Sequence, residues 1–543
     1  NYGLTIGGNL TGNAGTWTLT ERASTITVSG NWDTSAIATD NVSIGEGTST
    51  VVMNGTGTKT IKTGATSNWR PRFYNLNVGQ SGNTTQMIAS FGINGTISLG
   101  TGTFSLNGYT LSIESLITSP FSLNPSGTWG VGNGALIMFN DSYPTQNYTL
   151  PAFTYNSNLQ TNQTTGTKTT FLGTTTITGN LTMGCCSRAS EFDLNGQTVT
   201  VTGNVLLGTT TAILTMGAAT LNIGGNFTNV AGAVFTANTS TVNFTSTTTG
   251  KTITSAGDSF YNLTFNGSGG VWTPQDALVA TNDLTMTAGT LSGTQNVTVN
   301  GAVAGTAGII SLTGGTFEQR VGAAKNFGTT SGSTAWTFYD LTLSNSHASS
   351  PFTVTTQTGG TGGITVSDIL RVGKSGDAAG ATTTLDAGNR IWTLSGTGGD
   401  PFQLLASPLG ALTGSTSKFY YTGANAGGNT TVQSTSGSYY DLELNSADTF
   451  VLEADTVVTN NLTITHASAI LDVTASNYAL SIGNNYSNSG TFTARSGTVT
   501  FNATDSGNTL SGTLNGTSAF YKVIFNGVAG AWTIQDPMLV DTS

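Results

Sequence analysis

The chain has 543 residues and a formal net charge of −10, and only 8% of its residues are charged, compared with roughly 25% in ordinary soluble domains. Its 16 Lys and Arg residues form no basic stripe, which argues against nucleic-acid binding, and no run of about 18 apolar residues predicts a membrane span. With 73 Gly and 36% hydrophobic residues, the composition indicates an ordered chain whose polar surface consists of hydroxyl and amide groups.

The first residues already belong to a repeat. Residues 1–7 (Asn-Tyr-Gly-Leu-Thr-Ile-Gly) match residues 477–483 (Asn-Tyr-Ala-Leu-Ser-Ile-Gly). Near the other end, residues 483–543 match residues 225–283, and the earlier copy continues directly into Leu-Thr-Met. We therefore expect the sequence to be a segment of a longer chain.

An aromatic motif then returns along the chain. The form Phe-Tyr-Asn/Asp-Leu begins at residues 73, 260 and 338, looser forms begin at 439 and 520, and a degenerate form lies near 155. A chain that repeats itself in this way is built by stacking one supersecondary unit on the next. We predict one continuous repeat array over residues 1–543, with unit landmarks near residues 73, 155, 260, 338, 439 and 520.

Short runs with an apolar residue at every second position recur between the landmarks. In chain order they include residues 106–113, 180–183, 194–201, 241–244, 461–464 and 498–501. This is the period of a half-buried β-strand, and the Thr, Val, Ile, Phe and Tyr of these runs suit a pleated surface. Because no stretch of about 12 residues has helical apolar spacing, we expect very little helix.

The pairing of these strands allows two interpretations. Asn-Gly between alternating runs, as at residues 107–108 and 195–196, is a strong hairpin signal and favours tandem antiparallel β-sandwich repeats. Asn and Gly also suit the corners of a parallel β-helix, whose coils of about 20–25 residues absorb insertions in corner loops. The repeat spacing is variable and only 10 Pro residues are present. We predict an all-β parallel β-helix (β-solenoid) of stacked coils, with the sandwich array as the alternative.

Residues that could carry chemistry are sparse. The two His residues, His347 and His466, lie far apart in the sequence, and the closest carboxylate pairs, such as residues 191/193 and 441/443, stand two residues apart. Two carboxylates on one strand face can serve acid–base catalysis or bind a cation, but a solvated strand face is the simpler interpretation. No zinc-ligand spacing, nucleophile elbow or phosphate loop occurs. We predict a non-enzymatic protein with no catalytic residues, no metal site and no cofactor.

Two adjacent cysteines, Cys185 and Cys186, are the only thiols of the chain. Neighbouring side chains on a strand point to opposite faces, so one buried and one exposed thiol are expected. A strained vicinal disulfide is the alternative.

Many Asn residues stand in Asn-x-Ser/Thr sequons, the acceptor pattern of N-glycosylation in exported proteins. We predict that some carry glycans if the source has that machinery. The candidate acceptors are Asn9, Asn54, Asn94, Asn180, Asn226, Asn262, Asn461 and Asn515.

The large aromatic residues are expected in the core or at corners, where deleting one costs about 3–5 kcal/mol. These include the landmark Phe and Tyr residues and Trp272, Trp336 and Trp532. An exposed minority could instead stack on sugar rings.

Several runs resemble the repeats of very large prokaryotic surface proteins. The similarity lies in residues 194–204 (Leu-Asn-Gly-Gln-Thr-Val-Thr-Val-Thr-Gly-Asn), 225–229 (Gly-Asn-Phe-Thr-Asn) and 260–265 (Phe-Tyr-Asn-Leu-Thr-Phe). Those proteins are adhesin-like chains with expected β-helical folds. The resemblance implies export, an extracellular cell-surface location and a structural or adhesive role, and it supplies no catalytic residues.

We therefore expect an extracellular structural protein, a cell-surface stalk, filament or surface-layer component. The expected partners are further protomers stacked end to end or other surface proteins, and glycans are further candidates; neither nucleic acid nor a membrane span is expected. An adhesin or tail-fibre-like carbohydrate-binding protein is the alternative, and a polysaccharide-degrading β-helix enzyme is a more remote one.

Overall fold

The computed structural model describes residues 3–13, 23–37, 48–64, 72–115, 117–130, 134–139, 146–163, 166–184, 190–378, 380–405 and 409–541. Cys185 and Cys186 lie outside these residues, so the expected pair of one buried and one exposed thiol and the alternative vicinal disulfide both stay predictions.

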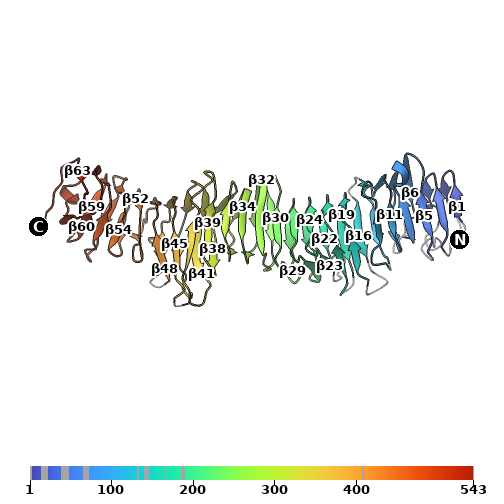
Figure 1. Ribbon diagram of the computed structural model, residues 1–543, viewed down its shortest axis with the longest axis horizontal. Coiled ribbons are helices and arrows are strands. Elements are labelled where there is room, and N and C mark those ends of the chain that lie inside the picture. The colour runs from blue at the N-terminus through green and yellow to red at the C-terminus, as the bar shows by residue number, and fades with distance from the viewer. Residues whose placement is uncertain are drawn as a thin grey trace. The chain divides into compact units, whose positions relative to one another are not determined.

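Within the described residues the regular structure is almost entirely β-strand, and the strands form parallel stacked coils of a β-solenoid with about 21 turns. Two short 3-10 turns, η2 (Gln80–Gly82) and η3 (Gly516–Ser518), complete the described elements. The predicted parallel β-helix is confirmed, and the parallel pairing excludes antiparallel sandwiches. The chain divides into two compact units: unit 1 comprises Asn1–Ser246 and Lys251–Tyr261, and unit 2 comprises Thr247–Gly250 and Asn262–Ser543. Figure 1 shows the strands of each unit side by side.

In unit 1 the strands form five parallel rows. The first row contains β1 (Gly3–Ile6), β3 (Thr25–Val28), β5 (Thr50–Met53), β8 (Asn75–Val78), β11 (Ile97–Leu99) and β14 (Phe121–Leu123). The second contains β2 (Leu10–Thr11), β4 (Trp32–Asp33), β6 (Thr58–Lys62), β9 (Thr84–Met87), β12 (Thr103–Ser105) and β15 (Thr128–Gly130). The third contains β17 (Tyr148–Leu150), β20 (Lys168–Phe171), β23 (Ser190–Asp193), β26 (Ala212–Thr215) and β29 (Val234–Thr236). The fourth contains β7 (Arg72–Phe73), β10 (Phe91–Ile93), β13 (Thr110–Ile113), β16 (Ala135–Phe139), β19 (Asn158–Asn162), β22 (Leu181–Met183), β25 (Val205–Leu207), β28 (Phe227–Asn229) and β31 (Lys251–Thr254). The fifth contains β18 (Thr154–Tyr155), β21 (Thr175–Ile177), β24 (Thr198–Val201), β27 (Thr220–Ile223) and β30 (Thr241–Phe244).

Unit 2 follows the same plan. One row contains β33 (Leu278–Ala280), β35 (Val297–Val299), β38 (Thr316–Val321), β41 (Asp340–Asn345), β44 (Leu370–Val372) and β47 (Phe402–Leu404). Another contains β32 (Asn262–Pro274), β34 (Leu284–Gly293), β36 (Val303–Gly305), β39 (Lys325–Thr329), β42 (Phe352–Thr356), β45 (Thr383–Asp386), β48 (Gly410–Thr413) and β51 (Gly437–Ser438). From β34 a further row runs through β37 (Ile309–Leu312), β40 (Trp336–Phe338), β43 (Ile364–Val366), β46 (Ile391–Leu394), β49 (Lys418–Tyr421), β52 (Asp441–Leu444), β55 (Leu462–Ile464), β58 (Tyr486–Asn488), β61 (Asn508–Gly512) and β63 (Trp532–Ile534). Two short rows contain β50 (Thr430–Val432), β53 (Thr449–Leu452), β56 (Ile470–Asp472) and β59 (Thr491–Thr493), and β54 (Thr456–Val458), β57 (Leu480–Ile482), β60 (Thr498–Phe501) and β62 (Lys522–Phe525).

The core consists of inward columns that run from coil to coil. In unit 1 one column passes through Leu159, Leu181, Val205, Phe227 and Ile253, which are paired in register and fully or almost fully buried. Intervals of 22–26 residues separate these members, so one coil takes about the predicted length. Because alternate side chains point outward, the sequence period of two separates core from surface on every strand.

The Asn-Gly pairs form corners and not hairpins. Asn107 and Gly108 have φ values of 51° and 84°, and Asn195 and Gly196 have values of 50° and 70°. Both residues adopt the left-handed backbone conformation that these residue types tolerate, but each pair joins strands of different rows. The same turn residues therefore bend the chain into the next side of a coil.

The landmark aromatics mark core positions. One ring of each landmark is buried: Phe73, Tyr155, Phe260, Phe338, Tyr439 and Phe520. In five landmarks it is the first ring, whereas in the degenerate copy Phe153 is half-buried and Tyr155 takes the core position. Where a tyrosine follows, it lies half-buried or exposed, as at Tyr261 and Tyr339. Where two aromatic residues stand side by side in the motif, the first faces the core and the second faces outward. That all landmarks belong to one array of a longer chain stays a prediction.

In the part of the chain that the structure describes, no helix has the length and apolar character needed to cross a membrane.

Candidate functional site

A ladder of side-chain amides follows one corner of unit 1. Asn158 Oδ1 accepts a hydrogen bond from the backbone N–H of Asn180 at 2.9 Å, and Asn180 Oδ1 accepts from Asn204 at 2.8 Å. Asn204 and Asn226 continue the series to the N–H groups of Asn226 and Thr252, at 2.8 and 2.9 Å. Each bond satisfies a backbone donor at a corner, and every bond joins one coil to the next.

In unit 2 carboxylates take several of the corresponding places. Asp283, Asp340 and Asp441 each accept a backbone N–H of the next coil, at 2.7, 3.1 and 3.0 Å. A carboxylate is the stronger acceptor, but it adds a negative charge beside the outward face of the strands.

Five of the eight predicted glycosylation acceptors are ladder residues of this kind. Their Oδ1 atoms accept backbone N–H groups at 2.8–3.4 Å in Asn9, Asn180, Asn226, Asn262 and Asn461. Asn94 is half-buried, whereas Asn54 and Asn515 lie exposed outside the ladder. Glycosylation stays a prediction, and Asn54 and Asn515 offer the most accessible side chains for it.

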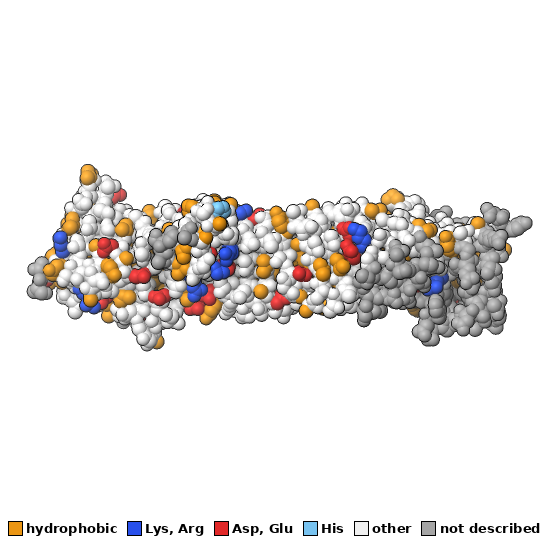
Figure 2. Space-filling view, turned by 90° about the horizontal axis from the view of Figure 1, so that it is seen from below, with side chains coloured by type: hydrophobic (Ala, Val, Ile, Leu, Met, Phe, Trp, Pro, Cys, Tyr) orange, Lys and Arg blue, Asp and Glu red, His pale blue; other side chains and the backbone are white. Residues whose placement is uncertain are grey.

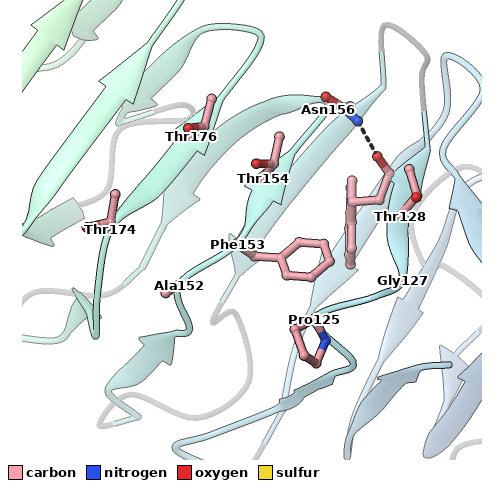
Figure 3. A pocket seen from close by; sticks show the side chains of 10 residues that line it. Pro125, Gly127, Thr128, Ala152, Phe153, Thr154, Asn156, Thr174 and Thr176 are labelled. Carbon is pink, nitrogen blue, oxygen red and sulfur yellow. Dashed lines mark hydrogen bonds between the residues drawn. The ribbon is translucent and has the colours of Figure 1, made fainter. Parts of the chain in front are cut away.

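Unit 1 carries a hollow of about 480 Å³, which we call the aromatic hollow. It is lined by Pro125, Gly127, Thr128, Trp129, Ala152, Phe153, Thr154, Asn156, Thr174 and Thr176. Figure 3 shows the half-buried Phe153 ring near Pro125, with Thr154 and Thr176 on neighbouring strands. None of these lining residues is titratable.

The floor of the aromatic hollow is a cluster of rings. Trp129 is fully buried, and its ring centroid lies 5.4 Å from Tyr155 in an edge-on arrangement. Phe153 lies 5.8 Å from Tyr155 in a similar geometry, and Asn156 Nδ2 donates to the Trp129 carbonyl at 2.6 Å (Figure 3). Such edge-to-face contacts add about 0.5–1.5 kcal/mol per pair beyond area burial, so these rings hold the coils together.

Unit 2 carries a second hollow of about 550 Å³, which we call the charged groove. Its lining residues are Asn296, Thr298, Thr316, Glu318, Thr342, Arg371, Lys374, Ser375, Gln403 and Leu405. Five of them form one outward column across five adjacent parallel strands, β35, β38, β41, β44 and β47: Thr298, Glu318, Thr342, Arg371 and Gln403. At about 4.8 Å per strand, this column spans about 19 Å.

Within the charged groove the acids lie deeper than the cations. Glu318 is 13% exposed, and its oxygens accept hydrogen bonds from Lys374 Nζ and Ser344 Oγ, both at 2.7 Å. Lys374 and Arg371 are 41% and 31% exposed. Arg371 Nε donates to Gln403 Oε1 at 3.2 Å, so the amide fixes one edge of the guanidinium. The solvent-facing layer of the groove is therefore cationic in a chain of net negative charge.

Asp340 lies beside the groove, with Oδ1 3.8 Å from Arg371 Nη1. Burial raises the pKa of this carboxyl above its ordinary value, although the positive charge of Arg371 acts in the opposite direction. The neighbouring Asp368 carboxylate adds to the increase. The Asp340 carboxyl therefore becomes protonated at a higher pH than that of a solvent-exposed aspartate.

The carboxylate pairs singled out in the sequence are occupied by separate partners. Asp193 pairs with Lys168, Glu191 with Thr215, Asp441 with Asn461 and Glu443 with Lys418. His347 and His466 use Nδ1 to accept backbone N–H groups of their own loops. Among the described residues, no three His, Cys, Asp or Glu side chains are grouped as metal ligands would be.

The surface is poor in both charge and exposed rings. Figure 2 shows a face that is mostly uncharged and polar, with Lys, Arg, Asp and Glu side chains gathered in a few places. Among the described residues the exposed aromatics are Tyr109, Tyr339 and Phe525, which lie far apart in the sequence and form no common platform in any row. Trp272 and Trp336 are buried and Trp532 is half-buried, as expected for packing.

Sequence reasoning did not identify the charged groove. Its column members stand 20–32 residues apart at unequal intervals, and Lys374 is 56 residues from Glu318. The only sequence signal was the local gathering of charges at residues 318–325 and 368–377 in a chain that otherwise has few.

Comparisons with protein-family models, with curated proteins and with solved structures find no match to this chain.

Proposed function

We propose that the chain is a non-enzymatic extracellular structural protein, a cell-surface stalk, filament or surface-layer component built from stacked β repeats. The observation that carries this proposal is the coil-to-coil bonding, in which backbone pairs, buried columns and the amide ladder all connect one turn with the next. Such a structure gains length simply by adding coils.

The chemistry of the amide ladder in unit 1 suits exposure to changing surroundings. Amide–backbone bonds and apolar columns carry no net charge, so salt screens them little and pH leaves them unchanged. The sparse surface charge of the chain supports the same role.

We further propose that protomers associate end to end, with the coil of unit 2 that contains β62 and β63 binding a coil of a second protomer. Phe525 in β62 is 48% exposed, whereas Phe265, its counterpart in the earlier copy of the repeat, is fully buried and pairs with Met286 of the next coil. Ile534 in β63 is also exposed. Parallel strand edges bind further strands readily.

Electron cryomicroscopy of native material from the source tests the structural role. We expect stacked coils about 4.8 Å apart that continue into neighbouring subunits at the cell surface. Finding the chain as a dispersed intracellular monomer would contradict the proposal.

Self-association is measured on the purified chain by light scattering over a range of concentrations. Phe525→Lys with Ile534→Lys should abolish any oligomers. Ile391→Lys is the matched control, because Ile391 is equally exposed on an interior strand. Oligomers that survive the double substitution, or a chain that stays monomeric at every concentration, would contradict end-to-end binding.

A further inference from the structure

We propose that the charged groove of unit 2 binds an acidic polysaccharide, a sugar polymer bearing carboxylate or sulfate groups. This inference goes beyond the structural role, because it assigns a ligand class to one surface of the array. It is carried by three features of the groove: its length, its layered charges and its hydroxyl and amide lining.

The length fits an extended ligand. The outward column crosses five parallel strands, about 19 Å, and the groove remains open to solvent along the sheet. The Lys374–Ser375 turn and Leu405 follow the carboxyl ends of β44 and β47, and Asn296 and Thr316 lie at the opposite ends of their strands. A chain molecule can lie between these two borders.

The arrangement of charges in the groove favours the binding of anions. Arg371 and Lys374 line the groove, and Arg320 lies next to Glu318 on the same strand, β38. The acids that pair with these cations are less exposed: Glu318 and Asp377, at 13% and 1%, form ion pairs with Arg320 at 3.7 Å. Asp340, at 17%, pairs with Arg371. Glu318 forms ion pairs with Arg320 and Lys374, which offset part of its negative charge.

Arg371 is the principal anion-binding group in this proposal. Its Nε is engaged by Gln403, which orients the plane of the guanidinium, while Nη1 makes only a 3.8 Å ion pair with Asp340. The terminal nitrogens can therefore donate two parallel hydrogen bonds to one carboxylate or sulfate group. Lys374 Nζ spends one of its three donors on Glu318 and can turn the others to the ligand.

The neutral members of the lining suit sugar hydroxyls. Thr298 and Ser375 supply hydroxyl groups that donate and accept, and the Thr316 hydroxyl, which donates to Asp340, can still accept. Gln403 has a side-chain NH₂ beyond the oxygen used by Arg371. Asn296 Oδ1 is occupied by the N–H of Thr316, which leaves its amide nitrogen as a donor. Specificity for a sugar polymer over a simple anion would come from these groups.

The test measures binding of the whole chain by titration calorimetry to polygalacturonate, to heparin oligosaccharides and to dextran. We expect binding to at least one anionic polymer, weakening as salt is raised, and none to neutral dextran. The two anionic polymers distinguish carboxylate from sulfate recognition. Failure of both at low salt, or equal binding of dextran, would overturn the proposal without affecting the structural role.

Substitutions in the charged groove test whether the polysaccharide binds there. Arg371→Gln with Lys374→Gln should weaken binding about tenfold or more, because hydrogen bonds to charged groups are lost. The matched control, Arg495→Gln with Lys522→Gln, removes two cations of unit 2 outside the groove and should change affinity less than about twofold. Equal losses in the two double variants would mean binding by net charge alone and would overturn the site.

A measurement on the unsubstituted chain avoids any effect of substitution on folding. Bound oligosaccharide should protect Lys374 from acetylation while Lys522, which is exposed outside the groove, reacts at an unchanged rate. Peptide mass spectrometry reads both sites, and an unprotected Lys374 at saturating ligand would contradict the proposal.

Discussion

The aromatic hollow of unit 1 and the charged groove of unit 2 are built on the same kind of parallel coil but have opposite chemistry. The hollow combines Phe153 with threonine hydroxyls and has no titratable lining residue, whereas the groove exposes Arg371 and Lys374 over Glu318. The inward columns beneath both are mainly apolar or aromatic, with Gln319 as a fully buried polar member under the groove. Because alternate side chains of each strand face outward, the outward positions can change their chemistry without changing the fold.

The largest expected effect comes from breaking the floor of the aromatic hollow. Trp129→Ala removes a fully buried ring that packs on Tyr155 and Phe104, and should destabilise the surrounding coils by about 3–5 kcal/mol. Hydrogen exchange of β15 and β18 measures this local loss, because a repeat array need not unfold in one step. Phe153→Ala, at the half-buried rim, is the control and should cost clearly less; equal losses would mean that the rim belongs to the core.

The next effect concerns Arg390, a buried cation of unit 2 that contrasts with the exposed cations of the charged groove. Arg390 is 1% exposed, and its guanidinium donates to Thr329 Oγ1 and to the carbonyls of Thr329, Gln357 and Gly362. Burial lowers its pKa, but these bonds hold the charge in place.

Arg390→Met should therefore cost about 2–3 kcal/mol, since it leaves buried carbonyls unpaired. Thermal unfolding and exchange of β39 measure the loss. Arg371→Met in the charged groove is the comparison and should change stability by less than about 1 kcal/mol. If Arg371→Met lowers the stability more than Arg390→Met does, then Arg371 stabilises the fold and Arg390 is not the main structural cation.

A smaller effect is expected from removing one negative charge from the charged groove. Glu318→Gln removes the ion pair with Lys374 but keeps an oxygen for Ser344, so stability should shift by less than about 1 kcal/mol. Affinity for the anionic polymer should rise severalfold, because the groove gains net positive charge. Asp472→Asn makes the same charge change beside Arg495, outside the groove, and an equal rise there would show that position does not matter.

The smallest effect is a pH dependence that only the groove should show. Because the pKa of Asp340 is raised, the folded chain takes up this proton at a higher pH than the unfolded chain, and the associated stabilisation grows as pH falls. Protonation removes the negative charge beside Arg371, so affinity for a sulfated oligosaccharide should increase as pH falls from 7 toward about 4. The sulfate groups stay charged in this range.

Asp340→Asn is the control for that series. It should bind at pH 7 about as tightly as the unsubstituted chain does under acidic conditions, and its affinity should vary less with pH. An unchanged pH profile in this variant would assign the dependence to another group, with Asp368 and Glu318 as the neighbouring carboxyls to test.

The all-β class, the alternation of core and surface, and the burial of a landmark ring in each unit follow from the sequence alone. These features are local: two residues per strand period decide which side chains face inward, and the run at residues 198–201 already separates Val199 and Val201 from the outward threonines. The sequons also indicated several Asn corners, although not their ladder bonds.

Only the tertiary structure decided which strands pair and which outward residues meet. Asn107–Gly108 fits a hairpin as well as a corner, because both need the same left-handed backbone, and parallel stacking resolves the choice. Arg371 meets Glu318 and Gln403 through registers set by corner loops of unequal length, so no fixed sequence interval reveals the groove. Inward packing follows from each strand alone, whereas an outward column depends on the path of every coil between its members.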